Sequence, residues 1–121
     1  MGEVSKISHK GKEILYINYN GCKSDSEMIE ILHKAVEIIV KENKEYLQLT
    51  DLTNSYATPG YMKEAKQVAK NTPKLATKRA IVGINSTGRL ILLKAYNLMI
   101  GDENAVKPFS SLEEAKDWLV S

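Results

Sequence analysis

The sequence has very little cysteine, with Cys22 as the one thiol among 121 residues. A single thiol excludes an intramolecular disulfide and a cysteine-rich metal site, and it suits a reducing compartment. The opening residues 1–6 lack the apolar stretch of a signal peptide. The chain also has no apolar run that approaches the roughly 18 residues of a membrane-spanning helix. We therefore expect a cytoplasmic protein without membrane insertion.

The sequence also lacks an excess of charge of one sign, because 17 basic residues face 15 acidic ones and the formal net charge is +2. A dedicated nucleic-acid binder would carry a clustered positive excess. Lys63, Lys66 and Lys70 do share one helical face, but the interleaved aromatic residues that would stack on bases are missing. We interpret this face as solvated and expect no nucleic-acid partner.

Motifs for catalysis and cofactor binding are missing as well. The segment 83–88 has neither the lysine of a phosphate-binding P-loop nor the glycine spacing of a dinucleotide fingerprint. His9 and His33 fall on different predicted elements, so they predict no metal pair, and the lone Cys22 has no catalytic partner. We expect no cofactor, no metal and no enzymatic activity. The exception left open is Asp51, a strand-end carboxylate that could act as a general base or simply accept N–H bonds from its own loop.

What the chain does have is the composition of an ordinary globular domain, with 43% hydrophobic and 26% charged residues. Its length predicts one domain over residues 1–121. Apolar residues alternate with strand or helix periodicity along the chain. The predicted strands are 4–9, 14–19, 46–52, 79–85 and 106–109, and the predicted helices are 24–41, 58–71, 89–100 and 112–119. This α/β order, β-β-α-β-α-β-α-β-α, predicts a mixed sheet whose second part is parallel.

That order, together with the segments 11–17, 49–53, 78–83 and 109–119, resembles a STAS domain with the fold of the sporulation anti-sigma-factor antagonist. The most similar-looking proteins are uncharacterised bacterial STAS-like proteins. The resemblance implies a non-enzymatic regulatory or protein-interaction module. Members of the antagonist family carry a phosphorylatable serine in an Asp-Ser-Ser-Gly string at the helix start after the third strand. Segment 51–60 lacks that string, and Ser55 and Thr58 are the candidates for phosphorylation that occupy a similar place.

Polar residues follow two of the predicted parallel strands, where ligands tend to bind in open α/β sheets. The predicted ligand or partner site consists of Asp51, Asn54, Ser55, Thr58, Asn85, Ser86, Thr87 and Arg89. Helix N-termini at this edge offer free N–H groups, so an anion or a polar peptide would fit between the two loops. The alternative is that Thr58, Ser86 and Thr87 only cap their helices.

The predicted helix 89–100 is apolar almost all round, whereas a surface helix usually has one apolar stripe. Three interpretations stay open: burial by neighbouring elements, a homodimer face, or an apolar pocket. The surface or pocket residues are Leu92, Leu93, Tyr96 and Met99. The pocket interpretation gives an alternative function, a small apolar-ligand or lipid-binding protein like the related CRAL-TRIO fold. The predicted partners are thus another protein, a second copy of the chain, or an apolar small molecule.

Overall fold

The computed structural model describes residues 2–43, 46–55, 58–71, 76–84, 86–101 and 105–121, except for the side chains of residues 76–77 and 99–100. Within these residues, five strands and four helices follow the predicted order. The elements are β1 (Glu3–His9), β2 (Lys12–Asn18), α1 (Asp25–Glu42), β3 (Tyr46–Asp51), α2 (Pro59–Asn71), β4 (Ala76–Val82), α3 (Thr87–Ile100), β5 (Val106–Phe109) and α4 (Leu112–Leu119). The α/β prediction is confirmed. The largest difference is in β4, predicted over 79–85, which ends at Val82 because Gly83 takes a φ of 96°.

The sheet has the strand order β1-β2-β3-β4-β5, with β1 antiparallel to β2 and all other neighbours parallel. The β1–β2 hairpin turns at Lys10 and Gly11, whose φ angles of 50° and 81° are both positive. A two-residue turn of this kind matches the natural twist of the two strands. The parallel arrangement brings the ends of β3 and β4 to the same edge of the sheet, as the predicted site requires.

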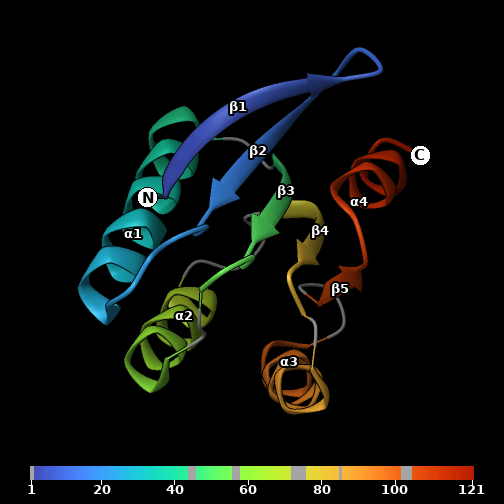
Figure 1. Ribbon diagram of the computed structural model, residues 1–121. Coiled ribbons are helices and arrows are strands. Elements are labelled where there is room, and N and C mark those ends of the chain that lie inside the picture. Colours follow the sequence, from blue (N-terminus) through green and yellow to red (C-terminus); the bar gives the residue numbers. More distant parts are fainter. Residues whose placement is uncertain (1, 44–45, 56–57, 72–75, 85, 102–104) are drawn as a thin grey trace.

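Helices cover both faces of the sheet, with α1, α2 and α3 on one side and α4 on the other (Figure 1). Because side chains alternate along a strand, neighbouring residues enter different cores. Leu15 of β2 packs with the three-helix side, whereas Ile14 packs with Ala115 and Leu119 of α4. All four of these side chains are fully or almost fully buried. Strand residues on the face that α2 and α3 cover therefore line the space between these helices and the sheet.

Serine and threonine side chains cap the N-termini of the helices, as the sequence predicts. Ser24 Oγ accepts from the Glu27 N–H at 3.2 Å, and Ser111 Oγ accepts from the Glu114 N–H at 3.2 Å. At α2 the Thr58 Oγ1 accepts from the Tyr61 N–H at 3.2 Å. Each bond satisfies a backbone donor that the helix itself leaves without a partner.

Among the residues that the structure describes, none of the helices has the combined length and hydropathy that a membrane crossing would need.

Candidate functional site

Asp51 ends β3 and is 4% exposed. Its Oδ2 accepts from the Tyr16 hydroxyl at 2.7 Å, and its Oδ1 accepts from the Thr53 N–H at 2.9 Å. Burial, with the hydrogen bond to Asp51, raises the pKa of Tyr16 well above its ordinary value, so this hydroxyl stays a proton donor. These bonds fix the start of the β3–α2 loop. Each carboxylate oxygen thus accepts one hydrogen bond, and the bond from the Thr53 N–H is the loop contact that the sequence offers as an alternative for Asp51.

Ser55 lies inside the same loop and is 1% exposed. Its Oγ donates to the Leu52 carbonyl at 3.0 Å, and its backbone N–H donates to the same oxygen at 3.1 Å. Asn54 before it has a φ of 58°, the left-handed conformation that this tight turn needs. A kinase would have to open the loop to reach Ser55, whereas the half-buried Thr58 serves as the N-terminal cap of α2. Phosphorylation of either residue stays a prediction.

Arg89, in the first turn of α3, connects the two strand-end loops. Its Nη1 donates to the Gly83 carbonyl at 2.8 Å and its Nη2 donates to the Ser55 carbonyl at 2.6 Å. The loops are also in close contact, since a Cβ added to Gly83 would lie 2.7 Å from the backbone of Leu52. The structure thus brings the two predicted loops together, with a guanidinium joining their carbonyls.

The rest of the predicted site lies at the start of α3. Ser86 Oγ accepts from the Arg89 N–H at 3.2 Å, which is the capping alternative, and Thr87 is exposed. Asn85 falls outside the described residues. Asp51, Ser55, Thr58, Ser86 and Arg89 of the predicted site thus bond to the loops, strands and helix ends around them.

The residues of α3 divide into a covered and an uncovered side. Leu93 and Tyr96 are each 7% exposed and face the sheet. Leu92 is 48% exposed and Leu98 is 88% exposed. The side chain of Met99, also predicted for this surface, lies outside the description. Burial thus explains one side of this apolar helix and leaves the other side open to contact.

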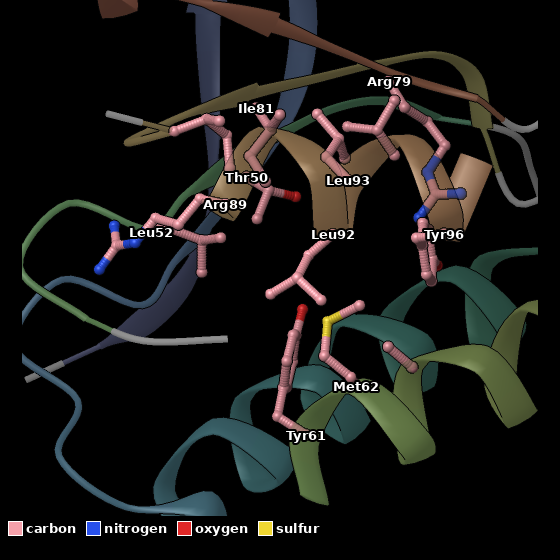
Figure 2. A pocket seen from close by; sticks show the side chains of 13 residues that line it. Thr50, Leu52, Tyr61, Met62, Arg79, Ile81, Arg89, Leu92, Leu93 and Tyr96 are labelled. Carbon is pink, nitrogen blue, oxygen red and sulfur yellow. The ribbon is translucent and has the colours of Figure 1, made fainter. Parts of the chain in front are cut away.

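A cavity of about 70 Å³ lies between α2, α3 and the sheet. It is lined by Thr50, Leu52, Tyr61, Met62, Ala65, Arg79, Ile81, Ile84, Arg89, Leu92, Leu93, Tyr96 and Val106. Figure 2 shows Tyr61 and Met62 rising from α2, Leu92 and Leu93 between them and the sheet, and Arg79 ending beside Tyr96. Leu92, Leu93 and Tyr96, which the sequence assigns to a dimer surface or an apolar pocket, line this cavity, and ligand binding there stays a prediction.

A second cavity of about 60 Å³ continues beneath α2 toward α1. The two cavities share Thr50, Tyr61, Ala65, Arg79 and Tyr96. Four of the shared residues, Thr50, Tyr61, Arg79 and Tyr96, carry polar groups, whereas the remaining wall is largely aliphatic. Burial raises the pKa of Tyr61 to about 12, and its hydroxyl donates to the Tyr19 hydroxyl at 3.1 Å.

An open groove of about 510 Å³ lies on the outer side of α2 and α3. Its walls are Pro59, Met62, Lys63, Lys66, Gln67, Lys70, Leu92 and Ala95. Met62 and Leu92 line both this groove and the inner cavity, so their side chains separate the two spaces. The lysine face predicted to be solvated is thus one wall of a groove whose other wall is apolar.

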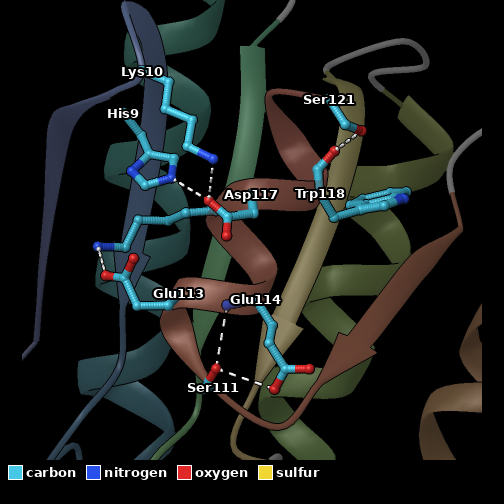
Figure 3. Close-up of polar contacts among 9 residues, drawn as sticks. His9, Lys10, Ser111, Glu113, Glu114, Asp117, Trp118 and Ser121 are labelled. Atoms are coloured by element: carbon cyan, nitrogen blue, oxygen red, sulfur yellow. Dashed lines mark hydrogen bonds and ion pairs between the residues drawn. The ribbon is translucent and has the colours of Figure 1, made fainter.

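A further polar cluster joins the β1–β2 hairpin to α4 (Figure 3). His9 Nε2 lies 2.7 Å from Asp117 Oδ1, and ligand atoms of His9, Glu113 and Asp117 all lie within 4.8 Å of one another. Imidazole and carboxylate groups are ligands that zinc accepts. However, Lys10 Nζ lies 3.0 Å from Asp117 and Lys116 Nζ lies 3.1 Å from Glu113, so ammonium groups already compensate both carboxylates. The hydrogen bond from His9, with that from Lys10, lowers the pKa of Asp117. The arrangement is an ion-pair network. His9 and Lys10 lie more than 100 residues before Asp117, so no short sequence motif indicates this contact.

Comparison of the chain with models of protein families, with curated proteins and with solved structures finds no match.

Proposed function

We propose that the chain is a non-enzymatic interaction module of STAS type that binds an acidic, partly apolar segment of another protein in the groove between α2 and α3. The observation that supports this proposal most is the groove itself. One wall carries Lys63, Lys66 and Lys70, and the other offers the half-exposed Leu92. Exposed apolar side chains rimmed by polar ones are typical of protein contact surfaces.

Charge favours an acidic partner. The basic residues of α2 and α3 are Lys63, Lys66, Lys70, Arg89 and Lys94, whereas their acidic residue is Glu64. Glu64 points to the other side of α2, where its Oε2 lies 2.6 Å from His33 Nε2 of α1. The groove therefore has a positive potential in a chain that is close to neutral as a whole, and such a patch steers and orients a negatively charged partner.

The same charges disfavour a second copy of the chain as the occupant. A two-fold symmetric contact places the same patch of both copies together. Lys63 and Lys66 of one copy would then approach the lysines of the other, and like charges that face each other weaken association. A homodimer through another surface, such as the exposed end of α3, stays a separate prediction.

The strand-end loops support binding rather than catalysis. Asp51, Ser55 and Arg89 all bond to neighbouring loop atoms, so they shape the edge of the sheet beside the groove. A general base needs to reach the proton that it abstracts. Both oxygens of Asp51 instead accept bonds from Tyr16 and Thr53.

The test compares two charge-reversed variants in quantitative affinity capture from cells of the source organism. K63E/K70E changes two exposed lysines of the α2 face, and the control K23E/K41E makes the same charge change on exposed lysines of the α1 side. The proposal expects an acidic partner that the first variant loses and the control keeps. Its capture should also weaken as salt rises, because exposed charges are screened. Equal capture by both variants, or recovery of anionic membrane in place of a protein, would contradict the proposal.

A further inference from the structure

The two edges of the sheet differ in what covers their outer backbone groups. β5 forms one edge, and the backbone of its Val106 exchanges two hydrogen bonds with the Asn97 side chain of α3. The Val106 N–H donates to Asn97 Oδ1 at 2.9 Å, and its carbonyl accepts from Asn97 Nδ2 at 2.9 Å. Pro108, two residues later, has no N–H. Short length, proline and a covering group all prevent an edge from pairing with another strand, so β5 is a closed edge.

β1 forms the other edge, with seven residues, no proline and unbroken pairing to β2 (Figure 1). The hairpin turn has two residues, so His9 and Lys12 are the pair beside it that exchanges hydrogen bonds. Because bonded and non-bonded pairs alternate, the backbone groups of Val4, Lys6 and Ser8 point away from β2. In the part of the chain that the structure describes, no hydrogen bond to the outer backbone groups of these three residues is present. β1 is therefore an open edge, available to a further strand.

The side chains of β1 favour a second copy of the same strand. Val4 packs against the core on the α1 side and Ile7 against the α4 core, so both faces of the edge carry a partly buried apolar residue. Glu3 begins the strand, whereas His9 ends it and Lys10 follows. An antiparallel second β1 brings these opposite charges toward each other at both ends, and a parallel one would align like charges. A two-fold axis generates the antiparallel arrangement from identical strands.

The side chains also select the register of such a pair. Two strands related by a two-fold axis pair about one central residue, and side chains directly opposite each other share a face of the sheet. Centring on Lys6 would place two ammonium groups directly opposite, which destabilises the pair. Centring on Ser5 instead places Lys6 opposite Val4 of the second copy and pairs residues 3–7 of both strands. The Lys6 ammonium is compensated within its own chain by Glu42 of α1.

We propose that β1 pairs antiparallel with β1 of a second copy about a two-fold axis at Ser5, which joins the two sheets into one. The outer backbone groups of Val4 and Lys6 then exchange hydrogen bonds across the axis. The groove between α2 and α3 is lined by residues of those helices and by none of β1. This interface is therefore separate from the protein-binding groove and does not depend on it.

Sedimentation and amide hydrogen exchange of the unaltered protein test the pairing itself. The mass should rise from that of one 13.5 kDa chain toward twice that value as concentration rises into the millimolar range. The amide protons of Val4 and Lys6 should become protected over the same range, whereas those of Ser5 and Ile7, which face β2, should be protected throughout. A chain that stays monomeric, or outer amides that exchange equally fast at all concentrations, would overturn the proposal and leave the edge to a strand of another protein.

Ser5→Cys tests the axis, and Ser8→Cys is the matched control on the same strand. In the proposed register the two copies of residue 5 form a non-hydrogen-bonded pair with Cα atoms about 4.5 Å apart, within the reach of a disulfide. The two copies of residue 8 lie six strand positions, or roughly 20 Å, apart. Mild oxidation should therefore cross-link Ser5→Cys roughly tenfold more than Ser8→Cys. The unaltered protein, whose Cys22 is buried, provides the background.

Lys6→Pro and Lys6→Thr isolate the outer hydrogen bonds. Both variants lose the ion pair with Glu42, but only proline removes the outward N–H. Proline is tolerated on an edge strand where the N–H faces solvent, so the fold should persist. Two bonds are lost in each dimer, and Lys6→Pro should associate about thirtyfold more weakly than Lys6→Thr.

Equal cross-linking of the two cysteine variants, or equal association of the two Lys6 variants, would overturn the proposal. The cysteine comparison decides the question even if Lys6→Pro does not fold. Because these readouts do not involve Lys63 or Lys70, a failure here leaves the protein-binding proposal standing.

Discussion

Replacing Arg89 with methionine removes the guanidinium that joins the β3–α2 and β4–α3 loops and keeps an unbranched apolar body of similar reach. The two lost bonds are those to the Gly83 carbonyl at 2.8 Å and to the Ser55 carbonyl at 2.6 Å. Hydrogen bonds from charged donors contribute about 1.5–3 kcal/mol each. Arg89 is half-buried, so the lower value applies and the expected loss is about 3 kcal/mol in the free energy of unfolding.

Urea denaturation followed by far-UV circular dichroism measures this loss as a lower midpoint with an unchanged slope. Thermal unfolding should show a fall in Tm of about 12 °C, from about 4 °C for each kcal/mol in a domain of this size. Lys94→Met is the matched control, because Lys94 is an exposed cation on the same helix. The control should stay within about 0.5 kcal/mol of the unaltered protein, as surface substitutions usually do.

A stability loss for Arg89→Met no larger than that of the control would refute the idea that Arg89 holds the loops together. The competing idea is that Arg89 binds an anion at the strand ends, as the sequence predicts. In that case sulfate would raise the Tm of the unaltered protein and not that of Arg89→Met. The structure leads us to expect a similar small response to sulfate in both proteins.

Three further predictions concern the same region and the core beneath it. Gly83→Ala should lower the free energy of unfolding by about 1–3 kcal/mol. The φ of 96° disfavours a residue with a side chain, and its Cβ would lie 2.7 Å from the Leu52 backbone. Thermal unfolding measures this loss. Ser55→Asp should unfold the loop rather than imitate phosphorylation, since it buries a carboxylate at a site 1% exposed, and proteolysis between β3 and α2 would reveal this. Burial raises the pKa of Tyr61 to about 12, so the folded state keeps a proton that the unfolded state releases near pH 10. The stability from this group is therefore complete below pH 10 and falls as pH rises toward 12, and Tyr61→Phe should show a shallower alkaline decline in urea midpoint.

The sequence predicts the order of elements well because its local periodicities agree with the final fold. The alternation of apolar residues in 46–52 predicts a strand, and the helical spacing of apolar residues in 28–40 predicts a helix. Capping residues such as Ser24 and Ser111 mark helix starts that the structure confirms. The boundary of β4 is harder to predict. Ile84 extends the apolar run of Ala80, Ile81 and Val82, but the close approach of Gly83 to Leu52 ends the strand at Val82. That contact depends on a loop more than 25 residues earlier, so no local pattern reveals it.

The sequence predicts which loops lie together at the candidate site, but it does not predict where their side chains point. Parallel strands place the ends of β3 and β4 together, so a sequence pattern can find the neighbourhood of Asp51 and Arg89. Whether the Arg89 guanidinium points to a ligand or to carbonyl oxygens depends on the loop geometry. The cavity depends on how Met62 and Leu92 pack across two helices, and the pair of His9 and Asp117 depends on where α4 lies. These features come from tertiary packing, which the sequence pattern does not specify.

The exposed side of α3 is the feature that the fold itself explains least. Burial of Leu93 and Tyr96 against the sheet provides the stability that this helix contributes to the core. Leu98, at 88% exposed, and Ile91, at 61%, bury little surface in the single chain, so their loss would remove little of that stability. Charged side chains at these positions would serve a helix of a solitary protein equally well and would favour its solubility. Under the proposed function, a partner in the groove between α2 and α3 would contact this helix at Leu92 and Ala95, which line the groove, and would cover Ile91 and Leu98 only if it extended beyond them.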